Sequence, residues 1–176
     1  MKTEHHQTLE ALQLALEVER DGRECYLEAV GNSSTEAGKK LLLALADDEE
    51  AHRLKVEEIY NAIRMRQTWP TGDLPADRRG DLRLLLAQTC RALGVDAKPN
   101  TTELDILKIA IEKESKSLDF YEKQSEAAVY DGEQEFYKAL TAQEKEHHFI
   151  LLDYYELLAD PAGWFLWKEH QSLDGG

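Results

Sequence analysis

Cysteines and long apolar runs are scarce in this sequence of 176 residues. The two cysteines, Cys25 and Cys90, form no C-x-x-C pair and are too few for a disulfide framework, so we expect reduced thiols, with a single bridge between them as the alternative. The longest apolar run, 41–46, is six residues, whereas a membrane-spanning helix needs about 20. The polar start carries no apolar signal segment. We therefore expect a cytoplasmic protein without a membrane partner.

Positive charge is also in short supply. The chain has 21 Lys and Arg against 35 Asp and Glu, which gives a net charge of −14. Such a surface repels the phosphate backbone of nucleic acids and the anionic headgroups of a membrane. Neither is an expected partner.

Proline is rare and unevenly placed. The four prolines leave 1–69 and 100–160 uninterrupted, and both stretches are rich in Leu, Ala, Glu and Lys. Turn residues divide them near 31–34, where Ser34 or Thr35 can cap the next helix, and at 131–132. No alternation of β-branched residues indicates strands. The sequence predicts an all-α chain with four helices, at 4–30, 35–66, 102–130 and 133–159.

The segment between the two helix pairs is long and contains three of the prolines. A short helix is expected within it, at 82–93, and its length suits a crossover that runs along a bundle. The tail is rich in aromatic residues, so we expect it to fold back over apolar surface. We predict a single domain, 1–176, that is a four-helix bundle: a helical hairpin at 4–66, a crossover at 67–101, a second hairpin at 102–159 and the tail at 160–176.

Polar residues interrupt the apolar stripes of all four helices, and their positions repeat. Stripes with steps of three and four face a bundle core, so these polar residues are expected inside. Adding 95 to the number of each such residue in the first hairpin gives the same residue type in the second, which indicates an internal duplication. The pairs are Glu19 and Glu114, Tyr26 and Tyr121, Glu49 and Glu144, and His52 and His147.

The spacing places the four glutamates at one level of the bundle. The midpoint of Glu19 and Glu49 is position 34, in the first turn, and that of Glu114 and Glu144 is position 129, beside the second. Each glutamate is then about 15 residues, or roughly 22 Å, from its turn. All four can converge in the middle of the bundle.

Four buried carboxylates need compensation, because each uncompensated ion costs several kcal/mol. The alternatives are protonation, pairing with a base, for which Arg23 is the nearby candidate, and cation binding. One Glu from each of two helices plus Glu-x-x-His from the other two is the pattern of di-iron and di-manganese bundles. Oxygen and imidazole ligands suit iron or manganese, and zinc can occupy such a site. We expect two metal ions.

These residues carry a resemblance to a known family. The Glu-x6-Tyr and Glu-x-x-His pairs of both hairpins resemble the rubrerythrin branch of the ferritin-like superfamily. The resemblance implies a ferritin-like bundle with two iron ions, bridged by Glu49 and Glu144, with Glu19 and Glu114 as terminal carboxylates and one ligand each from His52 and His147. It also implies that Tyr26 and Tyr121 hydrogen-bond to ligand carboxylates at the catalytic centre, and that the protein is a homodimer.

Two departures from that family stand out. Full rubrerythrins carry a rubredoxin domain with two C-x-x-C pairs, which this chain lacks, so electrons must come from a separate donor such as a rubredoxin-type protein. They also place an extra Glu near the helix-three ligand, where this chain has Ala110, Ile111, Ser117 and Leu118. The leading hypothesis is a non-haem di-iron oxidoreductase of oxidative-stress metabolism that reduces peroxide or activates dioxygen.

Two alternatives are kept. The first is a ferroxidase or iron-handling protein of ferritin type, and the second is a bundle whose dinuclear metal site is purely structural. Several acidic and histidine residues near the ligands lie off the stripes and are expected at the surface. They are Glu17, Glu50, Glu112, Glu146 and His148, while His170 is expected to contact the tail.

Overall fold

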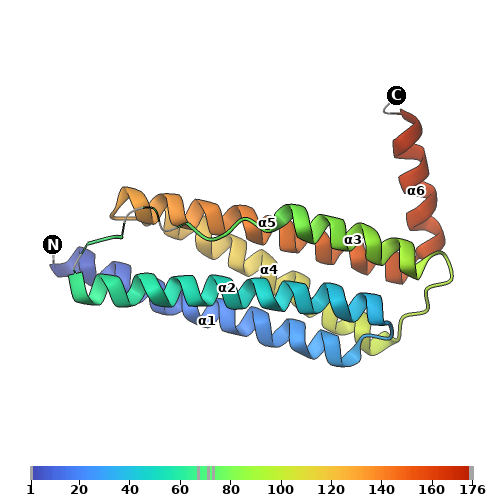
Figure 1. The fold of residues 1–176 in the computed structure, drawn as a ribbon, viewed down its shortest axis with the longest axis horizontal. Coiled ribbons are helices and arrows are strands. Elements are labelled where there is room, and N and C mark those ends of the chain that lie inside the picture. The colour runs from blue at the N-terminus through green and yellow to red at the C-terminus, as the bar shows by residue number, and fades with distance from the viewer. Residues whose placement is uncertain (1, 67, 71, 73, 175–176) are drawn as a thin grey trace.

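The computed structural model describes residues 2–66, 68–70, 72 and 74–174. That part of the chain contains six helices and no strand (Figure 1). The helices are α1 (Lys2–Asn32), α2 (Glu36–Arg66), α3 (Arg79–Leu93), α4 (Thr101–Ala127), α5 (Asp131–Ala159) and α6 (Pro161–Asp174). The all-α prediction is confirmed, and so are the four long helices, to within a few residues at their ends.

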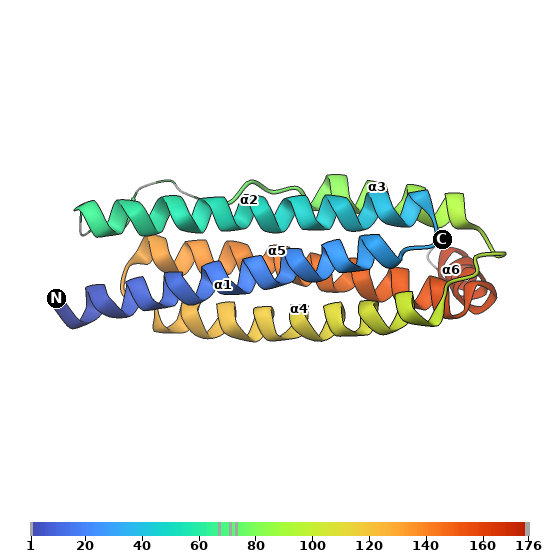
Figure 2. The same cartoon turned by 90° about the horizontal axis from the view of Figure 1, so that it is seen from below.

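Two helical hairpins form the bundle. Helix α1 packs along α2, α4 packs along α5, and α1 and α4 join the hairpins (Figures 1 and 2). The turn between α1 and α2 lies at one end of the bundle and the turn between α4 and α5 at the other. The crossover returns the chain along the bundle, and its helix α3 packs against both α2 and α5. The hairpins therefore run in opposite directions.

Side chains at the turns explain where two of the helices begin. Thr35 Oγ1 accepts a hydrogen bond from the Gly38 backbone at 3.0 Å, so Thr35, one of the two residues expected in this role, caps α2. Asn100 Oδ1 accepts one from the Glu103 backbone at 2.6 Å and caps α4. The two caps fix the residues at which α2 and α4 begin.

The apolar core is split into two clusters. One contains Tyr26, Leu45 and Leu151 and lies toward the turn between α1 and α2. The other contains Leu12, Val56 and Tyr121, among others, and lies toward the turn between α4 and α5. On each long helix, the buried glutamates and histidines of the repeat fall between the two clusters. The polar layer is thus closed by apolar side chains above and below.

The tail departs from its prediction. Trp164 and Phe165 pack against the core, as expected of aromatic residues, but helix α6 projects from the end of the bundle instead of folding back (Figure 1). Leu166 and Trp167 consequently remain 59% and 51% exposed. Packing covers only the first turns of α6 because the helix leaves α5 at a steep angle.

Two further predictions concern cysteines and membranes. Cys25 and Cys90 are both buried and are not joined by a disulfide, and reduced thiols remain the prediction. None of the helices in the described part of the chain is long and apolar enough to cross a membrane.

Candidate metal centre

All six predicted ligands meet in the polar layer. They form two groups in which one oxygen or nitrogen atom of each residue lies within 4.8 Å of the others. The first group is Glu19, Glu49, His52 and Glu144, and the second is Glu49, Glu114, Glu144 and His147. Glu49 and Glu144 belong to both. The arrangement can hold metal ions at two adjacent positions that share two carboxylates.

The two tyrosines tie the hairpins together at this level. The Tyr26 hydroxyl donates to Glu114 Oε1, and the Tyr121 hydroxyl donates to Glu19 Oε1. Each bond joins α1 to α4, so the tyrosine of one hairpin holds the glutamate of the other. Burial, followed by the charge of the glutamate it contacts, raises the pKa of each tyrosine well above its usual value. Both hydroxyls therefore stay protonated and can only hold the carboxylate as donors.

Four buried ligand atoms have no hydrogen-bond partner. They are Glu19 Oε2, His52 Nδ1, Glu114 Oε2 and Glu144 Oε1. Their residues are at most 3% exposed. Because orphaned buried polar atoms are rare in folded proteins, four of them in one cluster point to an additional partner. A cation can bind all four once His52 Nδ1 has lost its proton, because each atom then offers a lone pair.

Both histidines point the same ring nitrogen inward. His52 Nδ1 lies 3.2 Å from Glu144 Oε1, and His147 Nδ1 lies 2.7 Å from Glu49 Oε1. The rings stack, with centroids 5.6 Å apart and planes inclined by 16°. Each Nε2 points away from the four glutamates of the cluster, so Nδ1 is the atom that can ligate a metal ion.

Burial and the charges of neighbouring carboxylates shift the pKa values of clustered glutamates. Burial, then the charge of Glu144, raises the pKa of Glu114 well above its ordinary value, and burial acts in the same way on Glu49. Glu144 is the exception: burial opposes its ionisation, but contacts with both histidines lower its pKa to about 2. The cluster without metal therefore keeps protons on some carboxyls and a charge on Glu144.

The histidines carry the balancing charge. Burial alone would lower the pKa of His52, but the charge of Glu19 and the contact with Glu144 raise it well above its ordinary value. The contact with Asp48 likewise outweighs burial and raises the pKa of His147. Both shifts favour the protonated imidazole, so a metal ion would bind in competition with these protons.

A glycine makes room for one shared carboxylate. Gly22 lies on α1, one turn after Glu19, and a Cβ atom there would stand 2.9 Å from Glu49 Oε2. A real Cβ would force that carboxylate away from the cluster. The small residue is thus part of the centre.

The base named as an alternative partner does not reach the cluster. Arg23 Nε lies 3.7 Å from Glu50 Oε2, on the outer side of α2, and Glu50 is only partly buried. The ligand carboxylates pair instead with His52 and His147. Of the three ways to compensate four buried carboxylates, protonation and cation binding remain.

Two residues that contact the histidines were not predicted from the sequence. Asp48 Oδ2 lies 2.8 Å from His147 Nε2, and Gln143 Oε1 lies 2.7 Å from His52 Nε2. Asp48 and Gln143 directly precede Glu49 and Glu144, and the offset of 95 relates them too. Extending the repeat by one residue on the N-terminal side would have found them.

One prediction about surface residues was wrong. Glu146 was expected in solvent, but it is 5% exposed, because Arg83 of α3 lies over it and its NH2 atom is 2.7 Å from Glu146 Oε2. The expectation was drawn from the stripe of α5 alone, without the crossover helix. Of the other histidines, His148 is partly buried and His170 is exposed.

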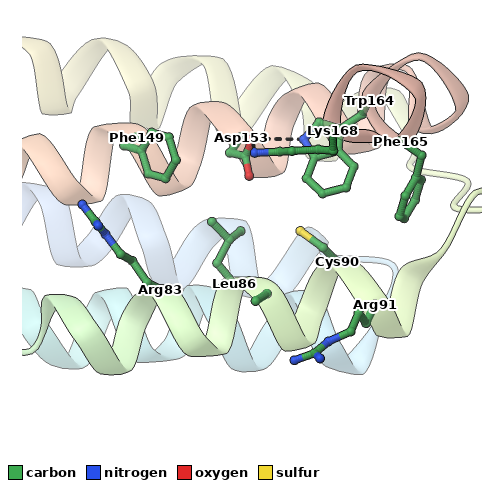
Figure 3. Close-up of a pocket in the computed structure, with 10 residues that line it drawn as sticks. Arg83, Leu86, Cys90, Arg91, Phe149, Asp153, Trp164, Phe165 and Lys168 are labelled. Carbon is green, nitrogen blue, oxygen red and sulfur yellow. Dashed lines mark hydrogen bonds and ion pairs between the residues drawn. The ribbon is translucent and has the colours of Figure 1, made fainter. Parts of the chain in front are cut away.

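A separate groove lies between α3, α5 and α6, with a volume of about 640 Å³. Figure 3 shows Leu86 and Cys90 on one wall and Phe149, Trp164 and Phe165 opposite. None of these residues is among the six predicted ligands, so the groove is distinct from the candidate metal centre.

Polar contacts at the groove attach α6 to the bundle. The Trp164 indole donates to Asp153 Oδ1 at 3.0 Å, and Lys168 Nζ lies 3.2 Å from the same oxygen. The Lys168 ammonium also lies over the rings of Trp164 and Trp167. These contacts at the groove hold the projecting helix α6 against the bundle.

Comparison of the chain with protein-family models, with curated proteins and with solved structures finds no match. The function of the cluster therefore has to be argued from its own geometry.

Proposed function

We propose that this protein is a non-haem di-iron oxidoreductase of rubrerythrin type on a ferritin-like bundle, reducing peroxide or activating dioxygen. The observation that carries the proposal is the pair of ligand groups that share Glu49 and Glu144. Two adjacent positions with two common carboxylates suit a dinuclear centre, in which electrons can be delivered in pairs.

The donor set is compatible with iron or manganese. Each position offers carboxylate oxygens and one imidazole nitrogen, from His52 or His147, and no thiolate. This set suits iron and manganese, while zinc can bind in their place without redox chemistry. The unpartnered atoms in the cluster support a resident cation.

The reaction has a simple balance. Reduction of hydrogen peroxide consumes two electrons and two protons, cleaves the O–O bond and releases two waters. Two ferrous ions bound in the cluster would supply the two electrons. The residues of the chain bind, orient and shield: Tyr26 and Tyr121 fix the terminal carboxylates, and the apolar clusters on either side restrict water.

The electrons for the next turnover come, in this proposal, from an external donor such as a rubredoxin-type protein. The two cysteines support this, because both are buried thiols, with Cys25 and Cys90 on different helices, and neither belongs to a C-x-x-C pair. The homodimer and the cytoplasmic location implied at the sequence level remain predictions. Light scattering on the purified protein tests the first.

Iron handling is the second candidate, and one observation favours it. The positions one turn on either side of Glu114 are Ala110, Ile111, Ser117 and Leu118, none of which supplies the extra carboxylate of rubrerythrins. A ferritin-type protein oxidises Fe(II) and assembles into a cage, so a monomer or dimer in solution would exclude storage in a shell. A purely structural site predicts no redox reaction at all.

The test begins with metal analysis of protein from iron-supplemented cells, with two irons per chain expected. The reduced protein is then mixed anaerobically with peroxide, and we expect consumption faster than by free ferrous ion. Glu49→Ala and Glu144→Ala should abolish both iron binding and consumption, while Glu17→Ala and Glu112→Ala, at exposed positions, should leave both unchanged. Iron-loaded protein that consumes neither peroxide nor dioxygen would refute the proposal.

A further inference from the structure

The outward nitrogens of the two histidines have different partners. His147 Nε2 faces the carboxylate of Asp48 at 2.8 Å, and His52 Nε2 faces the amide of Gln143 at 2.7 Å. Both partners are buried, at 1% and 3% exposure. They occupy equivalent positions of the repeat, so the difference is a local break in an otherwise symmetric centre.

A carboxylate fixes the tautomer of the histidine it contacts. An ionised Asp48 only accepts hydrogen bonds, so His147 Nε2 must carry the proton in that contact. In the neutral ring, Nδ1 then keeps its lone pair, and it points at Glu49 and the cluster. The negative charge of Asp48 also makes the ring a stronger donor to a cation.

An amide fixes the tautomer of its histidine less firmly than a carboxylate does. With Oε1 toward the ring, Gln143 accepts from His52 Nε2 and leaves Nδ1 free. Turned by about 180°, the amide would offer its NH2 group, and the proton would move to Nδ1, where it blocks ligation. Gln143 also brings no charge to its half of the centre.

Asp48 lies within hydrogen-bond distance of the histidine of one half of the centre, His147, and not of that of the other half, His52. Its Oδ2 is 3.8 Å from His52 Nε2, beyond hydrogen-bond distance, against 2.8 Å from His147. Its Oδ1 has no hydrogen-bond partner, and Arg78, the residue before α3, approaches it only to 3.8 Å. Of these three groups, His147 is therefore the one in closest contact with Asp48.

We propose that Asp48 makes the two metal positions unequal. The position formed with His147 and Glu114 binds its ion first and more tightly than the position formed with His52 and Glu19. This inference rests on the proposed binding of metal ions but not on the redox reaction. Asp48 is a positioning residue, since it acts on the ion through His147.

The test is titration of the metal-free full-length protein with Mn(II). Calorimetry and electron paramagnetic resonance monitor the binding. At one equivalent per chain we expect the spectrum of isolated ions, with the coupled pair forming only in the second step. The repeat supplies reciprocal variants: Asp48→Gln gives both halves an amide, and Gln143→Asp gives both a carboxylate. Removal of a partner that hydrogen-bonds to a metal-ligating histidine weakens metal binding by about 10–100-fold. We expect the affinity for the first Mn(II) ion to fall by this factor in Asp48→Gln.

Each variant has its own expected result. Asp48→Gln should bring the two binding constants together by weakening the first, whereas Gln143→Asp should do so by strengthening the second. His52→Ala should retain the tight step and His147→Ala should lose it. Circular dichroism verifies that each variant is folded.

The outcomes separate the two proposals. Two ions bound with equal affinity by the unsubstituted protein, or binding constants unchanged in both Asp48→Gln and Gln143→Asp, would overturn the inequality while leaving the metal centre intact. No Mn(II) or Fe(II) binding at all would overturn both.

Discussion

Tyr26 of the first hairpin donates its hydroxyl to Glu114 of the second, across the interface of α1 and α4. The reciprocal bond from Tyr121 to Glu19 makes the contact pseudo-symmetric. Each bond leaves one carboxylate oxygen of its glutamate free and facing the cluster. The orientation of the Glu19 and Glu114 carboxylates thus depends on the antiparallel packing of the two hairpins.

Removal of either tyrosine hydroxyl should destabilise the bundle. Tyr26→Phe leaves a buried carboxyl oxygen of Glu114 without its donor, and we expect a loss of about 1–3 kcal/mol in the free energy of unfolding. Tyr121→Phe should cost a similar amount, because the contacts are equivalent. Urea unfolding of the metal-free variants measures both. No loss in either variant would mean that the hydroxyls are dispensable for holding these carboxylates.

Gly22→Ala should weaken metal binding without weakening the helix. Alanine raises helix propensity by about 1 kcal/mol, but its Cβ would stand 2.9 Å from Glu49 Oε2 and displace that carboxylate. We expect Mn(II) affinity to fall while the helical circular dichroism signal is retained. Gly31→Ala is the matched control, because a Cβ there meets nothing within 4 Å. Equal affinities in the two variants would contradict the role assigned to Gly22.

The stability of the metal-free protein should fall as pH rises. Burial raises the pKa of Glu49 and Glu114, so the folded chain binds these protons more tightly than the unfolded chain. Their stabilisation is complete below an unfolded carboxyl pKa of about 4.3 and is lost as pH rises through the folded pKa. His52 and His147, with raised pKa values, act in the same direction above about pH 6.5.

Glu144 acts in the opposite direction at low pH. Its pKa is lowered to about 2, so its contribution is present above about pH 4.3 and is lost as pH falls toward 2. Urea unfolding in the presence of a chelator, at about pH 6 and about pH 8.5, should give a smaller free energy of unfolding at the higher pH. A larger value there would show that the cluster does not hold protons in the absence of metal.

Bound metal ions should reverse the fall in stability with rising pH. They compete with protons for the same atoms, so binding releases protons and strengthens as pH rises. At a free concentration of 100 times the dissociation constant, one bound ion stabilises the fold by about 2.7 kcal/mol. We expect stripping of metal to lower the melting temperature by several degrees, most at high pH. An unchanged melting curve would argue that the glutamates are protonated at all times and bind no cation.

Trp164 should contribute more to the free energy of unfolding than Trp167. Trp164 packs on the core and its indole donates to Asp153, so Trp164→Ala should reduce the free energy of unfolding by about 1–3 kcal/mol. Trp167 is 51% exposed, so Trp167→Ala should change it by no more than about 0.5 kcal/mol. Thermal unfolding of both variants checks the comparison. The reverse order would mean that the exposed side of α6 is covered in solution.

Much of the candidate centre was visible in the sequence. The stripes of α2 and α5 put Glu49, His52, Glu144 and His147 on core-facing turns, and the offset of 95 paired them. Helix periodicity is local, so it survives without knowledge of the neighbours. That the six residues act as metal ligands, and that the ions are iron, remain predictions.

What escaped sequence reasoning depends on contacts between helices. Glu146 lies off the stripe of α5 and is buried only because α3 and Arg83 cover it. Asp48 became important because its side chain reaches His147 on another helix. The direction of α6 was likewise missed, since aromatic content predicts burial but not the angle at which a helix leaves the bundle.

The sequence by itself determined the helices, the core-facing stripes and the duplicated set of glutamates, tyrosines and histidines. These features follow from spacing along a single helix, which the order of residues specifies completely. Only the tertiary structure decided that Tyr26 meets Glu114, that the outward nitrogens of the histidines face an aspartate on one side and a glutamine on the other, and that the crossover covers Glu146. Such contacts join residues distant in the chain, and they exist only once the hairpins have packed in opposite directions.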